Sequence, residues 1–386
     1  MASIGRSVVK QLGFGVFLGA VMLAALSWSP ARRCWKAGVM LTALSSAQAA
    51  AAPAPSQRPD PDRLIEEDVV VPGGDGPIRA RIYRRADQPR GRGLVIAHGI
   101  HHEGMHERRM VPFARALARA GRVVLTPELA DLADYRITRR GVADIRDAAL
   151  YLGARQDIVS EARVGLLGFS FAGGLALVAA AEPELAGRVE LVASVGGHHD
   201  LGRVLRFLIR NQVETPTGVV GKQAHDYGLV VLLYGAVDRL APETDRAVLR
   251  DALRASLHQD AEGARARATA LATDDGRRLW RLVEAQRLQE LAPAFEAIVR
   301  ERADELAQLS PAGRLAGIGV PVYVVHGAGD SVIPSAETDW AARELGDAPH
   351  VALVTPLIEH VEVNGQAGIA GIADKLALLR FIANIL

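Results

Sequence analysis

The chain has almost no cysteine, few lysines and no excess of charge of either sign. Its one cysteine, Cys34, excludes an intramolecular disulfide and any zinc cluster built from cysteines. Nearly all the basic residues are arginine, which we interpret as codon bias. The formal net charge is +1, from 45 basic and 44 acidic residues, so no overall field attracts nucleic acid or an acidic partner. We therefore expect neither as a ligand.

Length and composition leave the domain count open. Hydrophobic residues make up 49% of the chain and charged residues 23%, as in an ordinary globular protein. The 386 residues suffice for one large α/β domain with an insertion, or for two modest domains. The sequence contains no internal repeat, so the order of the elements has to decide between these arrangements.

Two uncharged runs open the sequence. Residues 11–31 carry no charge, and the stretch from Leu12 to Trp28 is almost wholly apolar, near the lower length of a membrane span. A second run, residues 37–57, is short and apolar like a secretory signal, and its Ala47-Gln48-Ala49 resembles a signal-peptidase site.

The basic cluster between the two runs argues against a helical hairpin. Arg32, Arg33 and Lys36 would then lie on the non-cytoplasmic side of the membrane, against the positive-inside tendency. Two interpretations remain: the first run is a true anchor, or the natural leader begins near Met22 and ends near Ala49. In both, residues 1–60 form a signal or anchor segment and a proline-rich linker. We expect a protein of the cell envelope, exported or membrane-anchored, with a possible membrane association through this segment.

Beyond the linker, short apolar runs alternate with helical patterns. The helical stretch 138–154 shows Val142, Ile145, Ala149 and Leu152 at spacings of three and four. The expected strands are residues 67–71, 78–83, 94–97, 122–126, 164–167, 189–195, 322–325 and 351–354. Between the sixth and seventh of these, the chain is helical and charged, with one ambiguous apolar run at 229–233.

Repeated strand–helix–strand alternation predicts a mostly parallel sheet with helices on both faces. The interruption and resumption of the pattern predict a helical insertion between sheet strands. We therefore expect an α/β core formed by residues 61–199 and 310–386, with residues 200–309 inserted as a cap.

A small-x-Ser-x-small run marks a candidate nucleophile. Ser170 follows the apolar strand at 164–167 and precedes an Ala/Leu-rich helix. A sharp strand-to-helix turn needs small residues two positions before and after the nucleophile, and Gly168 and Ala172 occupy those positions. Because the run lies between a predicted strand and a predicted helix, it indicates a nucleophile more specifically than its residue pattern alone would.

A serine nucleophile needs a base, and the base needs an acid that orients it. Asp330 occurs in the loop after a late strand, and His360 follows the next strand. With these three motifs in the order Ser, Asp, His, the sequence resembles the α/β-hydrolase family over residues 63–197 and 310–386. The resemblance implies an α/β-hydrolase fold with Ser170 as nucleophile, His360 as general base and acid, and Asp330 as the residue that holds the imidazole.

The same resemblance implies an oxyanion hole made of backbone N–H groups. In the family pattern one donor belongs to the residue after the nucleophile, here Phe171, and another follows the first strand–loop motif His98-Gly99, here Ile100. Fixed donors stabilise the negative charge that develops on a carbonyl oxygen during acyl transfer.

Several histidines invite a metal site. His101, His102, Glu103 and His106 form a local cluster of metal-type ligands, but adjacent histidines should point in different directions, and we expect no metal. We expect His101 at the rim of the pocket. His198 and His199 follow a strand on the active-site side, where we expect them to contact substrate.

The resemblance implies hydrolysis of a carboxylic ester of a small-molecule acyl substrate without a cofactor. Peptidase, thioesterase, acyltransferase and carbon–carbon hydrolase activities also run on this fold, and fold alone does not separate them. The alternative from another class is a non-catalytic envelope binding or scaffold protein. Oligomeric state is left open.

Apolar residues in the insertion predict what it does. We expect Phe207, Trp280 and Phe295 to pack the insertion onto the sheet domain. Because strand ends beside the nucleophile flank the insertion, we expect it to roof the pocket and set substrate size.

Overall fold

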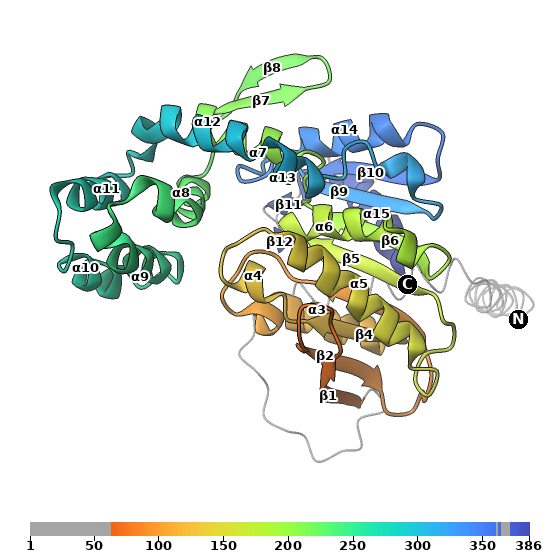
Figure 1. Ribbon diagram of the computed structural model, residues 1–386. Helices are drawn as coiled ribbons and strands as arrows, with labels where there is room; N and C mark the ends of the chain where they lie inside the picture. The colour runs from red at the N-terminus through yellow and green to blue at the C-terminus, as the bar shows by residue number, and fades with distance from the viewer. Residues whose placement is uncertain (1–62, 360–361, 364–370) are drawn as a thin grey trace, which may run out of the picture.

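The computed structural model describes residues 63–359, 362–363 and 371–386 (Figure 1). An eight-stranded sheet with the order β1-β2-β4-β3-β5-β6-β9-β10 forms its centre. β2 is antiparallel to both of its neighbours, and all other pairs are parallel. The strands are β1 (Leu64–Val71), β2 (Ile78–Arg85), β3 (Arg92–Ala97), β4 (Arg122–Pro127), β5 (Val164–Phe169), β6 (Val189–Val195), β9 (Val322–Gly327) and β10 (His350–Thr355).

The expected strands are all present, within a few residues at their ends. Strands β4 and β6 are buried along their whole length, as continuous apolar runs in a parallel sheet require. The edge strand β1 is exposed or half-buried except at its last residue, Val71. The mostly parallel sheet and the α/β-hydrolase fold expected from the sequence are therefore confirmed.

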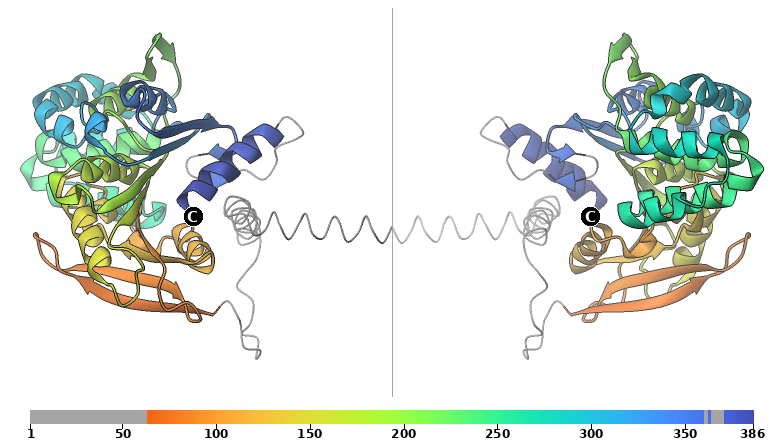
Figure 2. Two further views of the ribbon diagram at one scale, coloured as in Figure 1. Left: turned by 90° about the vertical axis from the view of Figure 1, so that its right-hand side faces the viewer. Right: turned by 90° about the vertical axis from the view of Figure 1, so that its left-hand side faces the viewer.

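Helices cover both faces of this sheet (Figure 2). Alternate residues of β3 face opposite layers: Val95 packs with one cluster of buried side chains and Leu94 with the other. The first layer contains α5 (Arg139–Ala154), α6 (Phe171–Ala180) and α14 (Ala336–Leu345). The second contains α3 (Met110–Arg119) and α15 (Ile372–Ile385). The short helix α4 (Ala130–Ala133) follows β4.

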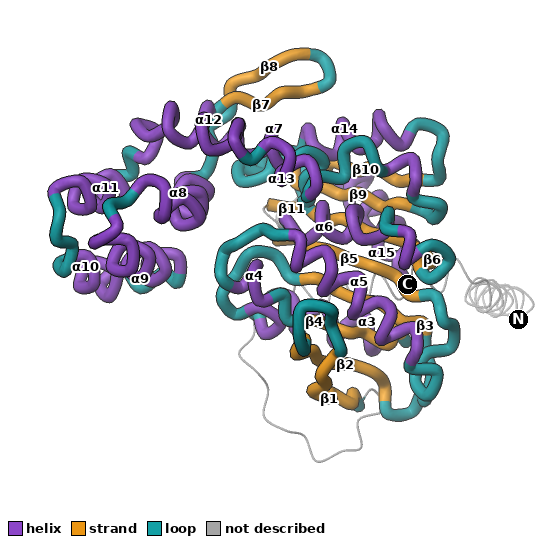
Figure 3. Tube along the Cα trace, viewed as in Figure 1, coloured by secondary structure: helices purple, strands orange, loops and turns teal. Residues whose placement is uncertain are grey.

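One crossover, from β6 to the neighbouring strand β9, contains the whole insertion (Figure 3). It is helical apart from one hairpin. Its elements are α7 (Leu201–Arg210), β7 (Gln212–Thr215), β8 (Gly218–Gly221), α8 (Asp226–Leu240), α9 (Arg246–Leu257), α10 (Ala261–Ala268), α11 (Asp274–Glu284), α12 (Ala292–Glu301) and α13 (Ala303–Gln308).

The structure decides one ambiguous segment of the insertion and adds one element that was not expected. The ambiguous run at 229–233 belongs to α8, where Leu229, Leu232, Leu233 and Ala236 are buried at helical spacing. The β7–β8 hairpin was not expected, because its four-residue strands are mostly exposed and carry no apolar alternation.

The insertion shares one continuous apolar cluster with the sheet domain. Phe207, Trp280 and Phe295 are buried, and they belong to the same cluster as Leu166 of β5. That these three side chains pack the insertion onto the sheet domain stays a prediction. Within the described residues no helix is both long and apolar enough to cross a bilayer. The leader at residues 1–60 lies outside them, as does His360.

Candidate active site

Ser170 occupies the sharp turn between β5 and α6. Its backbone has φ 53° and ψ −134°, a region that non-glycine residues rarely adopt and that costs about 1–3 kcal/mol. Its N–H donates to the Val195 carbonyl at 2.8 Å, and its carbonyl accepts from Gly173 N–H at 2.8 Å. The surrounding structure therefore holds a strained turn, which is a feature of functional positions.

Close backbone packing explains the small residues around the turn. A Cβ on Gly168 would lie 2.2 Å from the Ala172 carbonyl oxygen and 2.7 Å from the Gly173 nitrogen. Both contacts are with backbone, which cannot rotate away. Ala172 is itself fully buried, and its methyl is accommodated there. Glycine is thus required at 168, while alanine fits at 172.

We expect Gly168→Ala to destabilise the fold by about 2 kcal/mol or more, because the new methyl forces the turn apart. Gly235→Ala is the matched control: this glycine lies exposed in α8, and a Cβ there would meet nothing within 4 Å. The control should gain about 0.5–1 kcal/mol from helix propensity. Urea unfolding of both variants measures the difference, and equal stabilities would contradict the close packing.

Two backbone segments meet at Ser170, the start of α6 and the loop that leads to Ile100. Phe171 is the first residue of α6, where the first N–H groups of a helix have no partner within the helix. On the other side, a Cβ on Gly99 would lie 3.2 Å from Ser170 Cβ, so the loop that continues into Ile100 passes directly beside the serine.

His98 fixes that loop, a role that the sequence analysis did not assign to it. The buried ring accepts from Leu129 N–H through Nε2 at 2.9 Å, and its Nδ1 lies 2.7 Å from the Gly99 carbonyl. Because Nε2 accepts, the proton is on Nδ1 and donates to that carbonyl. Burial lowers the pKa of His98, which keeps the ring neutral. The only signal in the sequence was its place at the end of an apolar strand.

Asp330 is held in a fixed orientation in the loop after β9. The carboxyl group is buried, and its Oδ1 accepts from Val332 N–H at 2.8 Å and Ile333 N–H at 3.0 Å. Its Oδ2 lies 3.5 Å from Nε2 of the buried His326. His326 contacts the Ile333 carbonyl at 2.9 Å, so its Nε2 carries a proton and the ring helps to shape the loop.

Ser170 and Asp330 follow the carboxyl ends of parallel strands in one sheet. β6 lies between their strands, and Gly196 N–H after it donates to the Val325 carbonyl of β9 at 2.8 Å. The third expected member, His360, lies outside the described residues. Directly before it in the chain, β11 (Ile358–Glu359) pairs with β12 (Glu362–Val363) and contacts β9.

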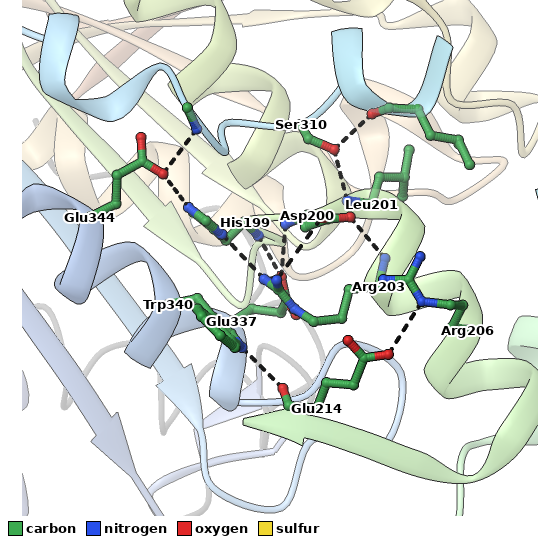
Figure 4. Close-up of polar contacts among 12 residues, drawn as sticks. His199, Asp200, Leu201, Arg203, Arg206, Glu214, Ser310, Glu337, Trp340 and Glu344 are labelled. Atoms are coloured by element: carbon green, nitrogen blue, oxygen red, sulfur yellow. Dashed lines mark hydrogen bonds and ion pairs between the residues drawn. The ribbon is translucent and has the colours of Figure 1, made fainter. Parts of the chain in front are cut away.

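The root of the insertion is a buried polar network (Figure 4). Glu337 of α14 accepts from Arg203 Nε at 2.7 Å and Nη2 at 2.9 Å. It also accepts from the backbone N–H of His199 at 2.9 Å and of Asp200 at 2.8 Å. The two ends of the insertion meet where Leu201 N–H donates to Ser310 Oγ at 2.9 Å. This network joins the insertion to the helix that follows the Asp330 loop.

His198 and His199, which we expected to contact substrate, both lie at this root. His199 Nε2 is 2.7 Å from Glu344 Oε2, and its Nδ1 is 3.2 Å from Arg203 Nη2. The buried His198 places Nε2 2.9 Å from the Leu309 carbonyl, with its ring 5.8 Å from that of Phe171. His198 is therefore the one of the two that packs against the serine turn.

His101 and His102 differ from the expected arrangement. Instead of pointing apart, their rings stack with centroids 4.5 Å apart and an interplanar angle of 26°, in a turn that Gly104 N–H closes onto the His101 carbonyl at 2.9 Å. Among the described residues, no group of three or more histidine, cysteine or acidic side chains is arranged to hold a metal ion.

No family model and no curated protein matches the sequence, and the similar proteins that comparison finds are solved structures of similar fold. A Pyrobaculum calidifontis esterase is 18% identical, with 100% of this chain and 98% of that one covered and a TM-score of 0.45. An alpha/beta hydrolase from Penicillium sp. sh18 is 15% identical, with 83% and 99% covered and a TM-score of 0.48.

The Pyrococcus horikoshii acylaminoacyl peptidase is a longer protein. It is 13% identical, with a TM-score of 0.43; the match covers 83% of this chain and only 39% of the peptidase. At these identities the likeness carries no information about substrate. The strand order, the parallel crossovers and the strained turn at Ser170 are together those of the α/β-hydrolase fold.

Proposed function

We propose that this chain is a serine hydrolase that cleaves a carboxylic ester, or a related acyl bond, with Ser170, His360 and Asp330 as its triad. The observation that carries the proposal is the strained backbone of Ser170 at the carboxyl end of β5. A strained backbone at this position is explained if the serine has a chemical role, since a serine without one could adopt an unstrained conformation. The buried, doubly hydrogen-bonded Asp330 at the same sheet edge supports the assignment.

In the proposed reaction Ser170 Oγ attacks the carbonyl carbon while His360 accepts the hydroxyl proton. The carbonyl oxygen becomes an oxyanion, to which the Ile100 and Phe171 N–H groups donate. The tetrahedral intermediate then expels the alcohol, which takes the proton from His360 and leaves an acyl-serine. Water repeats the sequence, releasing the acid and restoring Ser170. Asp330 holds the imidazole throughout, and the reaction needs no cofactor.

The insertion at residues 200–309 is, in this proposal, a cap that limits the size of the acyl substrate. The Glu337–Arg203 network supports this role, because it fastens the insertion beside the loop that presents Asp330. His225 N–H at the start of α8 also donates to the Ser331 carbonyl at 2.9 Å. The apolar leader further leads us to propose a location in the cell envelope.

A fluorophosphonate probe tests the reaction class, because it phosphonylates only a serine that a working base activates. We expect the wild-type protein to be labelled and Ser170→Ala to be unlabelled. Ser160→Ala, at an exposed serine, is the matched control and should be labelled like the wild type. A folded wild-type protein that takes up no probe and cleaves no p-nitrophenyl ester would instead be a non-catalytic protein on this fold.

A further inference from the structure

Three histidine rings form a column between the loop after Ile100 and the insertion. His102 stacks on His101 with centroids 4.5 Å apart, and on its other side His258 stacks at 4.2 Å with an interplanar angle of 25°. His258 directly follows α9, more than a hundred and fifty residues away in the chain. The column is thus a tertiary contact between the core and the insertion.

Tyr135 anchors the same end of α9 from the core. Its backbone lies in the left-handed region at φ 57°, although its side chain is bulky and 2% exposed. Its hydroxyl donates to the Leu257 carbonyl at 3.0 Å and accepts from His102 Nδ1 at 3.3 Å. The Tyr135 ring also lies 5.9 Å from that of His258. The last residues of α9 are therefore held from two sides.

The histidine column is covalently continuous with the proposed oxyanion hole. His101 directly follows Ile100, whose backbone N–H is one proposed oxyanion donor. We propose that His258 is a positioning residue of the hydrolytic site: by stacking on His102, and through it on His101, it holds the loop that presents the Ile100 N–H. The inference rests on the proposed function and adds a residue from the insertion to it.

The column should also respond to pH. Burial and then the charge of His102 lower the pKa of both His101 and His258. The neutral rings are therefore favoured above that lowered pKa, and two adjacent imidazolium ions repel one another as the pH falls below it. The charged or titratable groups around the column are Glu103, Glu107, Arg109, Asp134, Tyr135 and Arg254. The acidic groups among these raise the pKa values of the histidines and the arginines lower them, so the surrounding charges oppose one another.

Three variants separate positioning from general packing. His258→Ala removes the outer ring, and we expect kcat on a p-nitrophenyl ester and the rate of fluorophosphonate labelling to fall about tenfold, with little change in KM. His258→Phe keeps a flat ring and should restore most of the rate. His106→Ala, at an exposed histidine of η1 (Gly104–His106) in the same loop, should behave as wild type.

The pH profile adds a readout that packing alone would not change. Wild type and His258→Phe should have similar kcat/KM values at pH 8, whereas wild type should fall at least threefold below the variant once the pH is below the lowered pKa of His101 and His258. Dividing one profile by the other removes every titration that the two proteins share. Imidazole proton resonances give a third readout without substrate: His102→Ala removes the ring between the other two and should raise the pKa of both His101 and His258 towards the ordinary value.

The outcomes separate this inference from the proposed function. A wild-type protein that neither labels nor hydrolyses esters overturns the proposed function, and the positioning role with it. If the wild type is labelled but His258→Ala matches His106→Ala in kcat, only the positioning role is wrong. A flat ratio of the two pH profiles, or an unchanged pKa of His101 in His102→Ala, would contradict the titrating column.

Discussion

Ser170→Ala is expected to lower kcat on ester substrates by about 10⁴-fold or more, with little change in stability. The substitution removes the attacking oxygen and leaves the backbone donors of Ile100 and Phe171 in place. His360→Ala should cost about as much, because without a base the serine hydroxyl is a weak nucleophile. Steady-state kinetics over a series of p-nitrophenyl esters measure both losses.

The double variant decides whether the two residues act as a unit. If they do, Ser170→Ala combined with His360→Ala loses little more than either change alone, since one step fails in all three proteins. Losses that multiply would mean that another group serves as base for Ser170. Circular dichroism of each variant checks that the fold is intact.

Arg203→Ala should reduce the free energy of unfolding by about 3–5 kcal/mol. The substitution leaves the Glu337 carboxylate buried without its guanidinium, and the side chain of Glu337 is only 1% exposed. The Arg203 guanidinium also lies 4.7 Å over the Trp340 ring, and Trp340 Nε1 donates to the Glu214 carbonyl of β7. The loss therefore loosens α7, α14 and β7 together (Figure 4).

Arg210→Ala is the matched control for this effect. Arg210 lies on the same helix, α7, and pairs with Glu296 at 2.9 Å, but its side chain is 43% exposed. Water already solvates that pair, so its loss should hardly change stability. Urea unfolding followed by circular dichroism measures both variants. If both variants lose the same free energy of unfolding, burial of the Arg203–Glu337 pair does not add to its contribution to stability.

Much of the fold could be predicted because its signals are local. Buried parallel strands are continuous apolar runs, so the sequences of β4 and β6 alone are enough to predict them as strands. The turn at Ser170 is equally local: Gly168 and Ala172 lie two residues away on either side, and their size follows from the turn itself. The exposed β7–β8 hairpin has no such signal, and neither does the choice of helix for residues 229–233.

Taken alone, the sequence determined the order of strands and helices, the position of the serine turn and the place of the insertion between β6 and β9. Each of these depends on periodicity or on neighbours within a few residues. Only the tertiary structure decided which partners the histidines have. His199 meets Glu344, and His102 meets His258, across more than a hundred residues of chain. Contacts between distant segments depend on how whole elements pack, and the pattern of a single sequence does not encode that packing locally.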